Sequence, residues 1–209
     1  MAYKTRLDGH LQGLDHHARS GYDAAVGCLL ENDCLQRKMP KEKSNVVLIG
    51  MPGCGKSTIG VLLAKRLQMA FVDTDLIIQK AEAMPLHRLI ETRGMDSFCE
   101  IECGHNQKLD VSNTVIATGG SVVYYDCPMR HFQIDGIIVY LYLPKPELCQ
   151  RLGDLKKRGV VLQPGQTLDD LYEERTPLYE RWADVCVDLS GLDHEACVEA
   201  IIKKLAENT

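Results

Sequence analysis

Residues 46–63 read VVLIGMPGCGKSTIGVLL, in which a β-branched apolar run, a glycine-rich loop and apolar residues at helical spacing follow one another. The central part, Gly50 to Ser57, matches G-x-x-x-x-G-K-[ST] at every position, which predicts a phosphate-binding loop between a strand and a helix. Glycines let the backbone approach phosphate closely, and the start of the following helix adds partial positive charge. The stretch therefore predicts a nucleoside triphosphate site.

The motif also predicts the role of each residue in the loop. Lys56 would reach the β- and γ-phosphates, and the hydroxyl of Ser57 would bind Mg²⁺. Close packing of the loop around phosphates would involve the consecutive residues Gly53, Cys54, Gly55, Lys56, Ser57 and Thr58.

Composition excludes several classes of partner. The formal net charge is −5, so no basic bias favours nucleic acid. Nine cysteines occur without a C-x-x-C pair, and the i,i+4 pair Cys99 and Cys103 has no second pair of zinc ligands. Reduced thiols indicate a reducing cytoplasm. No apolar run reaches membrane-spanning length, so we expect a soluble cytoplasmic protein without a membrane partner.

The chain is expected to divide into an extension, residues 1–43, and an α/β domain, residues 44–209. Apolar residues at helical spacing predict one helix around 15–35, followed by a charged linker that ends at Lys43. A docked extension without chemistry and a dimerisation or regulatory helix are both open readings. We expect a monomer or a weak homodimer.

From Ser44 onward, strands and helices alternate, which indicates a parallel sheet with helices on both faces. Strands are expected at 45–49, 71–72, 114–117, 136–143 and 185–187. Helices are expected at 56–68, 75–82, 85–92, 96–110 and 146–153, then from Thr167, with Asp170 completing an approximate capping box, and after a cap at Asp193.

Asp73-Thr74-Asp75 ends a short strand, which is where open α/β sheets bind ligands. Alternate side chains of an extended segment point to opposite sides, so one aspartate can face a metal and the other a second substrate. Phosphoryl transfer needs both a Mg²⁺ ligand and a group that orients the acceptor hydroxyl. The alternative is that Asp75 only caps the next helix.

Two further features point to the same chemistry. Gly119 and Gly120 end another strand and would allow a ligand to approach the backbone, although a tight turn explains them equally well. Arg151 lies just before a glycine-containing loop, residues 153–166, that could close as a lid. Arg158 lies within this loop, and Arg175 follows it. Arginine stabilises charge on a transferring phosphoryl group or holds a carboxylate with two hydrogen bonds.

These features together resemble the shikimate kinase family over roughly residues 45–205, down to Arg175-Thr176-Pro177-Leu178-Tyr179. The resemblance implies a small P-loop kinase that transfers the γ-phosphate of ATP to a hydroxyl of shikimate. Its sheet would have five parallel strands in the order 2-3-1-4-5, with helices on both faces and a lid.

The resemblance also implies a role for each matching residue. Lys56 and Arg158 would stabilise the transferring charge, and Ser57 and Asp73 would hold Mg²⁺. Asp75 would orient the acceptor hydroxyl. Binding of the substrate would fall to Gly119, Gly120 and Arg175, and Arg151 would pack on adenine.

The chain departs from the family pattern at two positions. The family has Phe-Arg-x-x-Glu, whose arginine grips the shikimate carboxylate, and here Cys99 takes that place. Ser121 replaces a third glycine. Loss of one arm of the clamp costs about 1.5–3 kcal/mol. One reading is that another cation, such as Arg88 or Arg93, compensates for the missing arginine. The other is that the acceptor is not shikimate but a gluconate-like acid or a nucleotide. A non-catalytic ATP-binding regulatory module is the third reading.

Overall fold

The computed structural model describes residues 43–152 and 166–208, and all of these belong to one compact unit, Pro40–Thr209. The predicted N-terminal helix, and residues 153–165 of the loop with its Arg158, lie outside the described residues. None of the described helices is both long enough and apolar enough to span a membrane.

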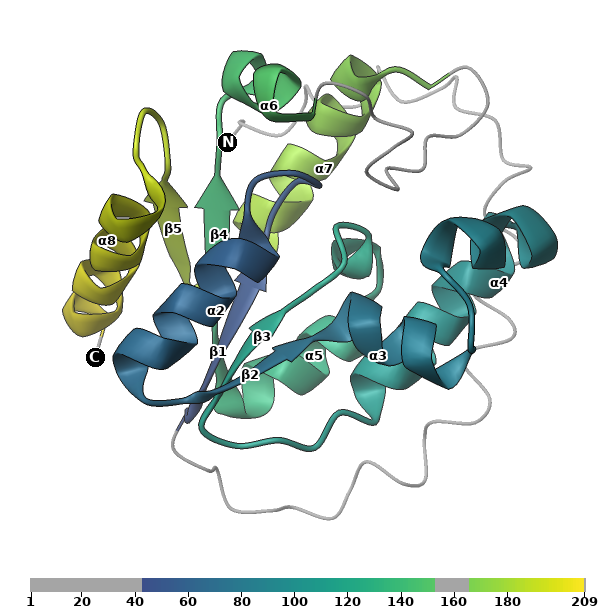
Figure 1. Cartoon of the computed structure of the whole chain (residues 1–209), viewed down its shortest axis with the longest axis horizontal. Coiled ribbons are helices and arrows are strands. Elements are labelled where there is room, and N and C mark those ends of the chain that lie inside the picture. The colour runs from purple at the N-terminus through teal and green to yellow at the C-terminus, as the bar shows by residue number, and fades with distance from the viewer. Residues whose placement is uncertain (1–42, 153–165, 209) are drawn as a thin grey trace, which may run out of the picture. The chain divides into compact units, whose positions relative to one another are not determined.

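The sheet is parallel, five-stranded and ordered β2-β3-β1-β4-β5, which confirms the expected fold class and strand order. β1 and β3 are buried along their whole length, as strands covered on both faces must be. Figure 1 shows the five strands side by side. Their bounds are β1 Asn45–Ile49, β2 Ala70–Asp73, β3 Thr114–Ala117, β4 Gly136–Tyr142 and β5 Val185–Asp188.

Helices cover both faces of this sheet (Figure 1). α2 (Lys56–Leu67) and α8 (His194–Glu207) pack together on one face, and α5 (Asp126–Asp135) and α7 (Leu168–Trp182) contact β4 from the other. α3 (Thr74–Ala81) and α4 (Leu86–Gln107) pack on each other beside the sheet, and α6 (Lys145–Leu152) follows β4.

The sequence did not reveal two of these elements, the 3₁₀ turn η1 (Val122–Tyr124) and α5. α5 carries Pro128 in its first turn and buries only Met129 and Phe132 besides that proline. Such a short helix has too few apolar residues to show a clear helical period. It forms because these side chains join the core under β4.

Local capping fixes the helix starts as expected. Thr167 and Asp170 form a reciprocal capping box at α7, and Asp193 caps α8 by accepting from the N–H of Ala196 at 2.8 Å. At α3 the capping side chain is Asp73, whose Oδ1 accepts from the N–H of Asp75 at 3.0 Å. The reading in which Asp75 is the cap is therefore wrong, and its carboxyl is free for another role.

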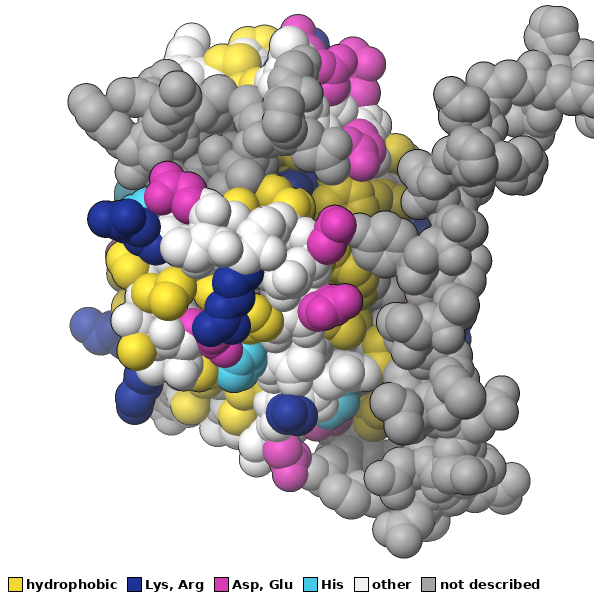
Figure 2. All heavy atoms as spheres, turned by 90° about the vertical axis from the view of Figure 1, so that its right-hand side faces the viewer, with side chains coloured by type: hydrophobic (Ala, Val, Ile, Leu, Met, Phe, Trp, Pro, Cys, Tyr) yellow, Lys and Arg dark blue, Asp and Glu magenta, His cyan; other side chains and the backbone are white. Residues whose placement is uncertain are grey.

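α4 bends at Gly94, where φ of 80° and ψ of 167° interrupt the helical geometry. A positive φ strains residues that have a Cβ, so glycine suits this break. The break separates the two helices expected at 85–92 and 96–110. Leu89 and Phe98, from opposite sides of the bend, pack with Ile78 in a second small core. Figure 2 views the side of the molecule on which α4 lies in Figure 1, where basic, acidic and apolar side chains are interspersed.

Candidate active site

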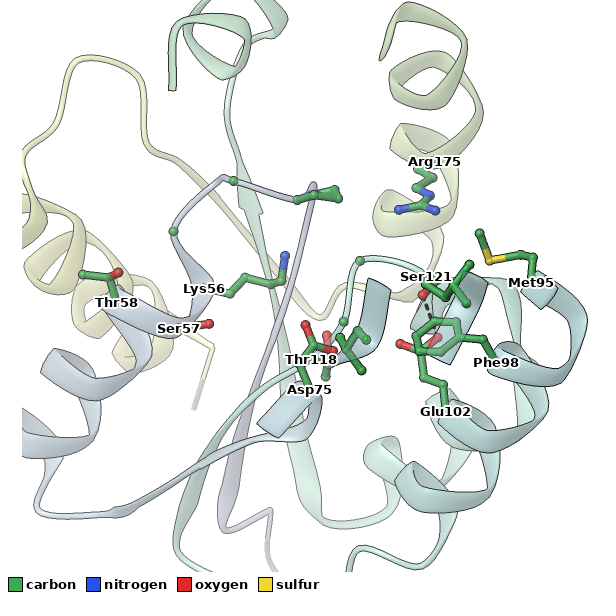
Figure 3. A pocket seen from close by; sticks show the side chains of 17 residues that line it. Lys56, Ser57, Thr58, Asp75, Met95, Phe98, Glu102, Thr118, Ser121 and Arg175 are labelled. Atoms are coloured by element: carbon green, nitrogen blue, oxygen red, sulfur yellow. Dashed lines mark hydrogen bonds between the residues drawn. The ribbon is translucent and has the colours of Figure 1, made fainter. Parts of the chain in front are cut away.

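A cavity of about 540 Å³ lies at the carboxyl ends of the strands, and the phosphate loop forms one of its walls. The other walls come from the start of α3, the segment after β3, both halves of α4, and α7. Figure 3 shows Lys56, Asp75, Glu102 and Arg175 around the same hollow. Open α/β sheets bind ligands in this position.

Lys56 occupies the phosphate side of the cavity. It is the first residue of α2, and its side chain folds back so that Nζ donates to the carbonyls of Gly50 at 2.7 Å and Met51 at 3.0 Å. The residue is 8% exposed and forms no ion pair with any described residue. A buried cation that is held by neutral groups of the loop, beside a helix N-terminus, is suited to bind phosphate.

Arg151 extends from the last turn of α6 toward the loop, where its Nη1 donates to the carbonyl of Cys54 at 3.4 Å. It does not line the cavity, and neither does the buried side chain of Cys54. Arg151 thus contacts the phosphate loop from outside the cavity.

Asp75 enters the cavity from the first turn of α3. Burial raises the pKa of its carboxyl to about 6; the neighbouring carboxylate of Asp73 acts in the same direction, and Lys56 opposes it. Asp73 itself does not line the cavity. The two aspartates thus lie in different places, with Asp73 capping α3 and Asp75 lining the cavity.

Gly119 and Gly120 form the floor of the cavity, directly after β3. A Cβ on Gly119 would overlap Oε1 of Glu102 and lie 2.9 Å from Oδ1 of Asp75. A Cβ on Gly120 would lie 3.0 Å from Pro52 and 3.1 Å from Nη1 of Arg175. Both glycines are needed because four different segments converge on the floor.

Substitution of Gly119 by alanine should therefore disrupt the site. We expect kcat/KM for the acceptor to fall about ten-fold or more, because the added methyl group displaces two carboxyl groups. KM for the nucleotide should change little. Gly104→Ala in α4 is the control, since a Cβ there meets nothing within 4 Å. Steady-state kinetics that match for the two variants would contradict this account of the floor.

Arg175 projects from α7 into the opposite side of the cavity (Figure 3). Its Nε donates to the hydroxyl of Tyr124 at 3.0 Å, and its guanidinium lies 5.0 Å from the centroid of that ring. The side chain is held, only 8% of the residue is exposed, and the remaining N–H groups can bind a ligand. One turn further along α7, Tyr179 donates to the carbonyl of Gly120 at 2.7 Å and ties the helix to the floor.

Glu102 and Ser121 also belong to the site, although neither was predicted to do so from the sequence. Both line the cavity, and the hydroxyl of Ser121 donates to Oε2 of Glu102 at 2.6 Å. Glu102 follows Phe98 by one helical turn, and Phe98 lies with Leu86, Ile90 and Met95 on the apolar wall. The signal that could have found Glu102 was the final glutamate of the Phe-Arg-x-x-Glu pattern, whose i,i+4 spacing from Phe98 places it on the same face of the helix.

The two arginines considered as compensation for Cys99 do not line the cavity. Nη1 of Arg93 pairs with Oε2 of Glu82 at 2.9 Å, and Arg88 is exposed on α4. Cys99 itself is buried in the second core beside Phe98, and burial raises the pKa of its thiol. The cations that line the cavity in the described part of the chain are Lys56 and Arg175.

The cavity thus unites most of the residues selected from the sequence. Those that line it are Gly53, Gly55, Lys56, Ser57, Thr58, Asp75, Gly119, Gly120 and Arg175. This arrangement, with a phosphate loop facing a carboxylate and an arginine from separate helices, defines a small P-loop phosphotransferase with a second substrate beside the nucleotide.

Comparison with known proteins narrows the class to one family. A family model described as shikimate kinase matches residues 52–206. A shikimate kinase of Thermodesulfovibrio yellowstonii is 37% identical over 163 residues, which cover 77% of this chain and 94% of that protein. The structure of an Acinetobacter baumannii shikimate kinase in complex with shikimate superposes with a TM-score of 0.73 at 29% identity, covering 79% of this chain and 94% of that one. The Aquifex aeolicus enzyme gives 0.69 at 30% identity, covering 78% and 97%. The chain belongs to the shikimate kinase family, whose members are ATP-dependent phosphotransferases.

Proposed function

We propose that this protein transfers the γ-phosphate of ATP to a hydroxyl group of shikimate. The observation that carries the proposal is that Asp75 and Arg175, from different helices, face the cavity that the phosphate loop closes on its other side. One carboxylate and one guanidinium are the two groups required by an acceptor that carries both a hydroxyl and a carboxylate.

On the nucleotide side, Lys56 and the N-terminus of α2 would bind the phosphates, and Arg151 would pack on the adenine. Arg158 would stabilise the transferring charge, although it lies outside the described residues. Ser57 and Asp73 would hold Mg²⁺, which when bound neutralises charge on the phosphates. The described residues contain no group of three His, Cys, Asp or Glu side chains that could hold a metal ion. Two protein ligands plus nucleotide phosphates are the usual set for Mg²⁺, so the residues present fit it.

On the acceptor side, Asp75 orients the hydroxyl and accepts its hydrogen bond. The glycine floor lets the acceptor lie close to the backbone, and Arg175 binds its carboxylate. The apolar wall of Leu86, Ile90, Met95 and Phe98 covers the ring of the acceptor. Proximity would supply much of the rate, because both reacting groups would be held in one cavity.

Because Cys99 cannot contribute charge, binding of the acceptor carboxylate should depend on Arg175. We expect Arg175→Met to raise KM for shikimate by about 10- to 100-fold, in line with 1.5–3 kcal/mol for a charged hydrogen bond. KM for ATP should stay within about two-fold. Arg181→Met is the control, since Arg181 lies on the same helix, is exposed, and approaches Asp126 and the ring of Trp182. If KM for ATP rose as much as KM for shikimate, Arg175 would not be a specific ligand of the acceptor carboxylate.

The proposal is tested by ADP release with shikimate, gluconate, nucleoside monophosphates and no acceptor. Turnover with shikimate at a kcat/KM at least about 100 times that of the others is expected. A higher kcat/KM with gluconate or a nucleotide would identify that compound as the acceptor instead of shikimate. Binding of ATP without release of ADP in the presence of every compound would indicate a non-catalytic ATP-binding module.

We also propose that the protein acts in the cytoplasm as a monomer or weak homodimer. The seven cysteines in the described part of the chain are all free, which fits a reducing compartment.

A further inference from the structure

Glu102 is a buried acid that pairs with no cation among the residues that the structure describes. Its side chain is fully buried at the centre of the α4 segment after the bend, and it forms no ion pair with any described residue. Oε2 accepts from Ser121, whereas Oε1 has no hydrogen-bond partner in the described part of the chain. Figure 3 shows this second oxygen turned toward the side of the cavity where Asp75 lies. An ionised carboxylate in this position would be poorly compensated.

The two departures from the family pattern meet at this side chain. Cys99, in place of an arginine, lies one turn before Glu102 on the same helix and offers it no positive charge. Ser121, in place of a glycine, supplies the hydroxyl that Glu102 uses. The serine holds Oε2, so the proton of a neutral Glu102 belongs on Oε1, next to Gly119.

We propose that Glu102 determines the specificity of the acceptor site by remaining protonated while the acceptor is bound, so that Arg175 keeps an uncompensated positive charge for the acceptor's carboxylate. This inference rests on the proposed function, because it concerns an anionic acceptor. Ionised Glu102 would offset the charge of Arg175, because both side chains are buried in the wall of the same cavity, where charges are screened less than on the surface.

The surroundings of Glu102 support its neutral form. Burial, with a smaller contribution from the carboxylate of Asp75 on α3, raises the pKa of its carboxyl to about 7, although Ser121, Arg175 on α7 and Lys56 on α2 each act to lower it. On its own helix, the thiols of Cys99 and Cys103 face it and carry no charge, because burial raises their pKa values above the ordinary range. A bound carboxylate adds another negative charge, so binding of the acceptor should raise the proton affinity of Glu102.

The direct test is titration calorimetry of the full-length protein with shikimate at pH 8, in two buffers of different ionisation enthalpy. We expect the wild type to take up about half a proton or more per shikimate bound, and Glu102→Gln to take up almost none. Between pH 6 and pH 8.5 the Kd of the wild type should rise about ten-fold, while that of Glu102→Gln stays within about two-fold. Glu100→Gln, exposed on the same helix, should behave like the wild type.

Ser121→Ala is a second test variant, for which the direction of the change in pH dependence can be predicted. Removing the hydroxyl that donates to Oε2 favours the neutral acid, so the weakening of shikimate binding should begin at a higher pH than in the wild type. Equal pH dependence of binding in the wild type and Glu102→Gln, or no proton uptake by the wild type, would overturn the inference. In either case turnover of shikimate would still support the proposed function.

The pH dependence of thermal unfolding reports the protonation of Glu102 in the absence of any ligand. The folded protein, with a pKa of about 7, keeps a proton that the unfolded chain releases near 4.5, so its stability falls as pH rises through this interval. Glutamine has no such proton. The Tm of Glu102→Gln relative to the wild type should therefore rise by roughly 4 °C or more between pH 5 and pH 8. If neither the wild type nor any variant binds shikimate, the proposed function fails. Independently of that result, a Tm difference between Glu102→Gln and the wild type that stays constant with pH would refute the protonation of Glu102.

Discussion

Replacement of Lys56 by alanine should reduce kcat by about 1,000-fold or more while the protein remains folded. Lys56 is the described cation on the phosphate side of the cavity, and its Nζ is held by the loop carbonyls close to where the γ-phosphate would lie. Loss of one preorganised charge donor costs about 100- to 1,000-fold in rate in other enzymes, and the transferring phosphoryl group carries more charge than most. ADP release and thermal unfolding should be measured on the same samples.

Lys65→Ala is the matched control, because Lys65 lies in the last turn of the same helix and is exposed. It should retain full activity. The alanine at position 56 removes two hydrogen bonds to loop carbonyls, so a Tm lower by a few degrees is compatible with the prediction. An active Lys56→Ala enzyme would refute phosphoryl transfer at this loop.

The second large effect is expected at Asp75. Asp75→Asn should lower kcat by about 100- to 10,000-fold at saturating Mg²⁺, the range for loss of a group that takes up or orients a proton. The carboxyl is well placed to take up or orient a proton, because it does not cap α3 and it lines the cavity beside Gly119. The asparagine is nearly isosteric, so the fold should be unaffected. The measurement is kcat as a function of shikimate and of Mg²⁺.

Asp73→Asn separates the two aspartates. The asparagine can still accept a hydrogen bond from the N–H of Asp75, so the helix cap survives. We expect a weakened apparent affinity for Mg²⁺, with much of the rate recovered at high Mg²⁺. Identical Mg²⁺ profiles for Asp73→Asn and Asp75→Asn would show that the two residues do not have separate roles.

The phosphate-binding half of this protein could be predicted from its sequence because its parts are contiguous. A strand, a loop with the full motif and a helix follow one another within residues 46–63, and the geometry of the loop is local. The caps at Thr167 and Asp193 were predictable for the same reason, since each partner lies three residues away. Strand alternation predicted a parallel sheet, and the family resemblance supplied its order.

The acceptor half required the tertiary structure. Whether Arg175 reaches the cavity depends on how α7 packs against β4 and on the contact of Tyr179 with Gly120, none of which is local in the sequence. α5 could not be predicted because its few apolar residues show no clear helical period and are stabilised only by packing against the core. The sequence showed that Cys99 and Ser121 break a pattern, but not that both changes concern Glu102.

The sequence by itself thus determined the fold class, the nucleotide site and the aspartates at the end of β2, because each is encoded by neighbouring residues whose backbone geometry is set locally. Only the tertiary structure decided which residues line the cavity beside the phosphate loop and which groups surround the carboxyl of Glu102. The pKa of a carboxyl depends on burial and on charges brought by distant segments, and here those charges come from α2, α3 and α7, which the packing of the sheet brings to one cavity.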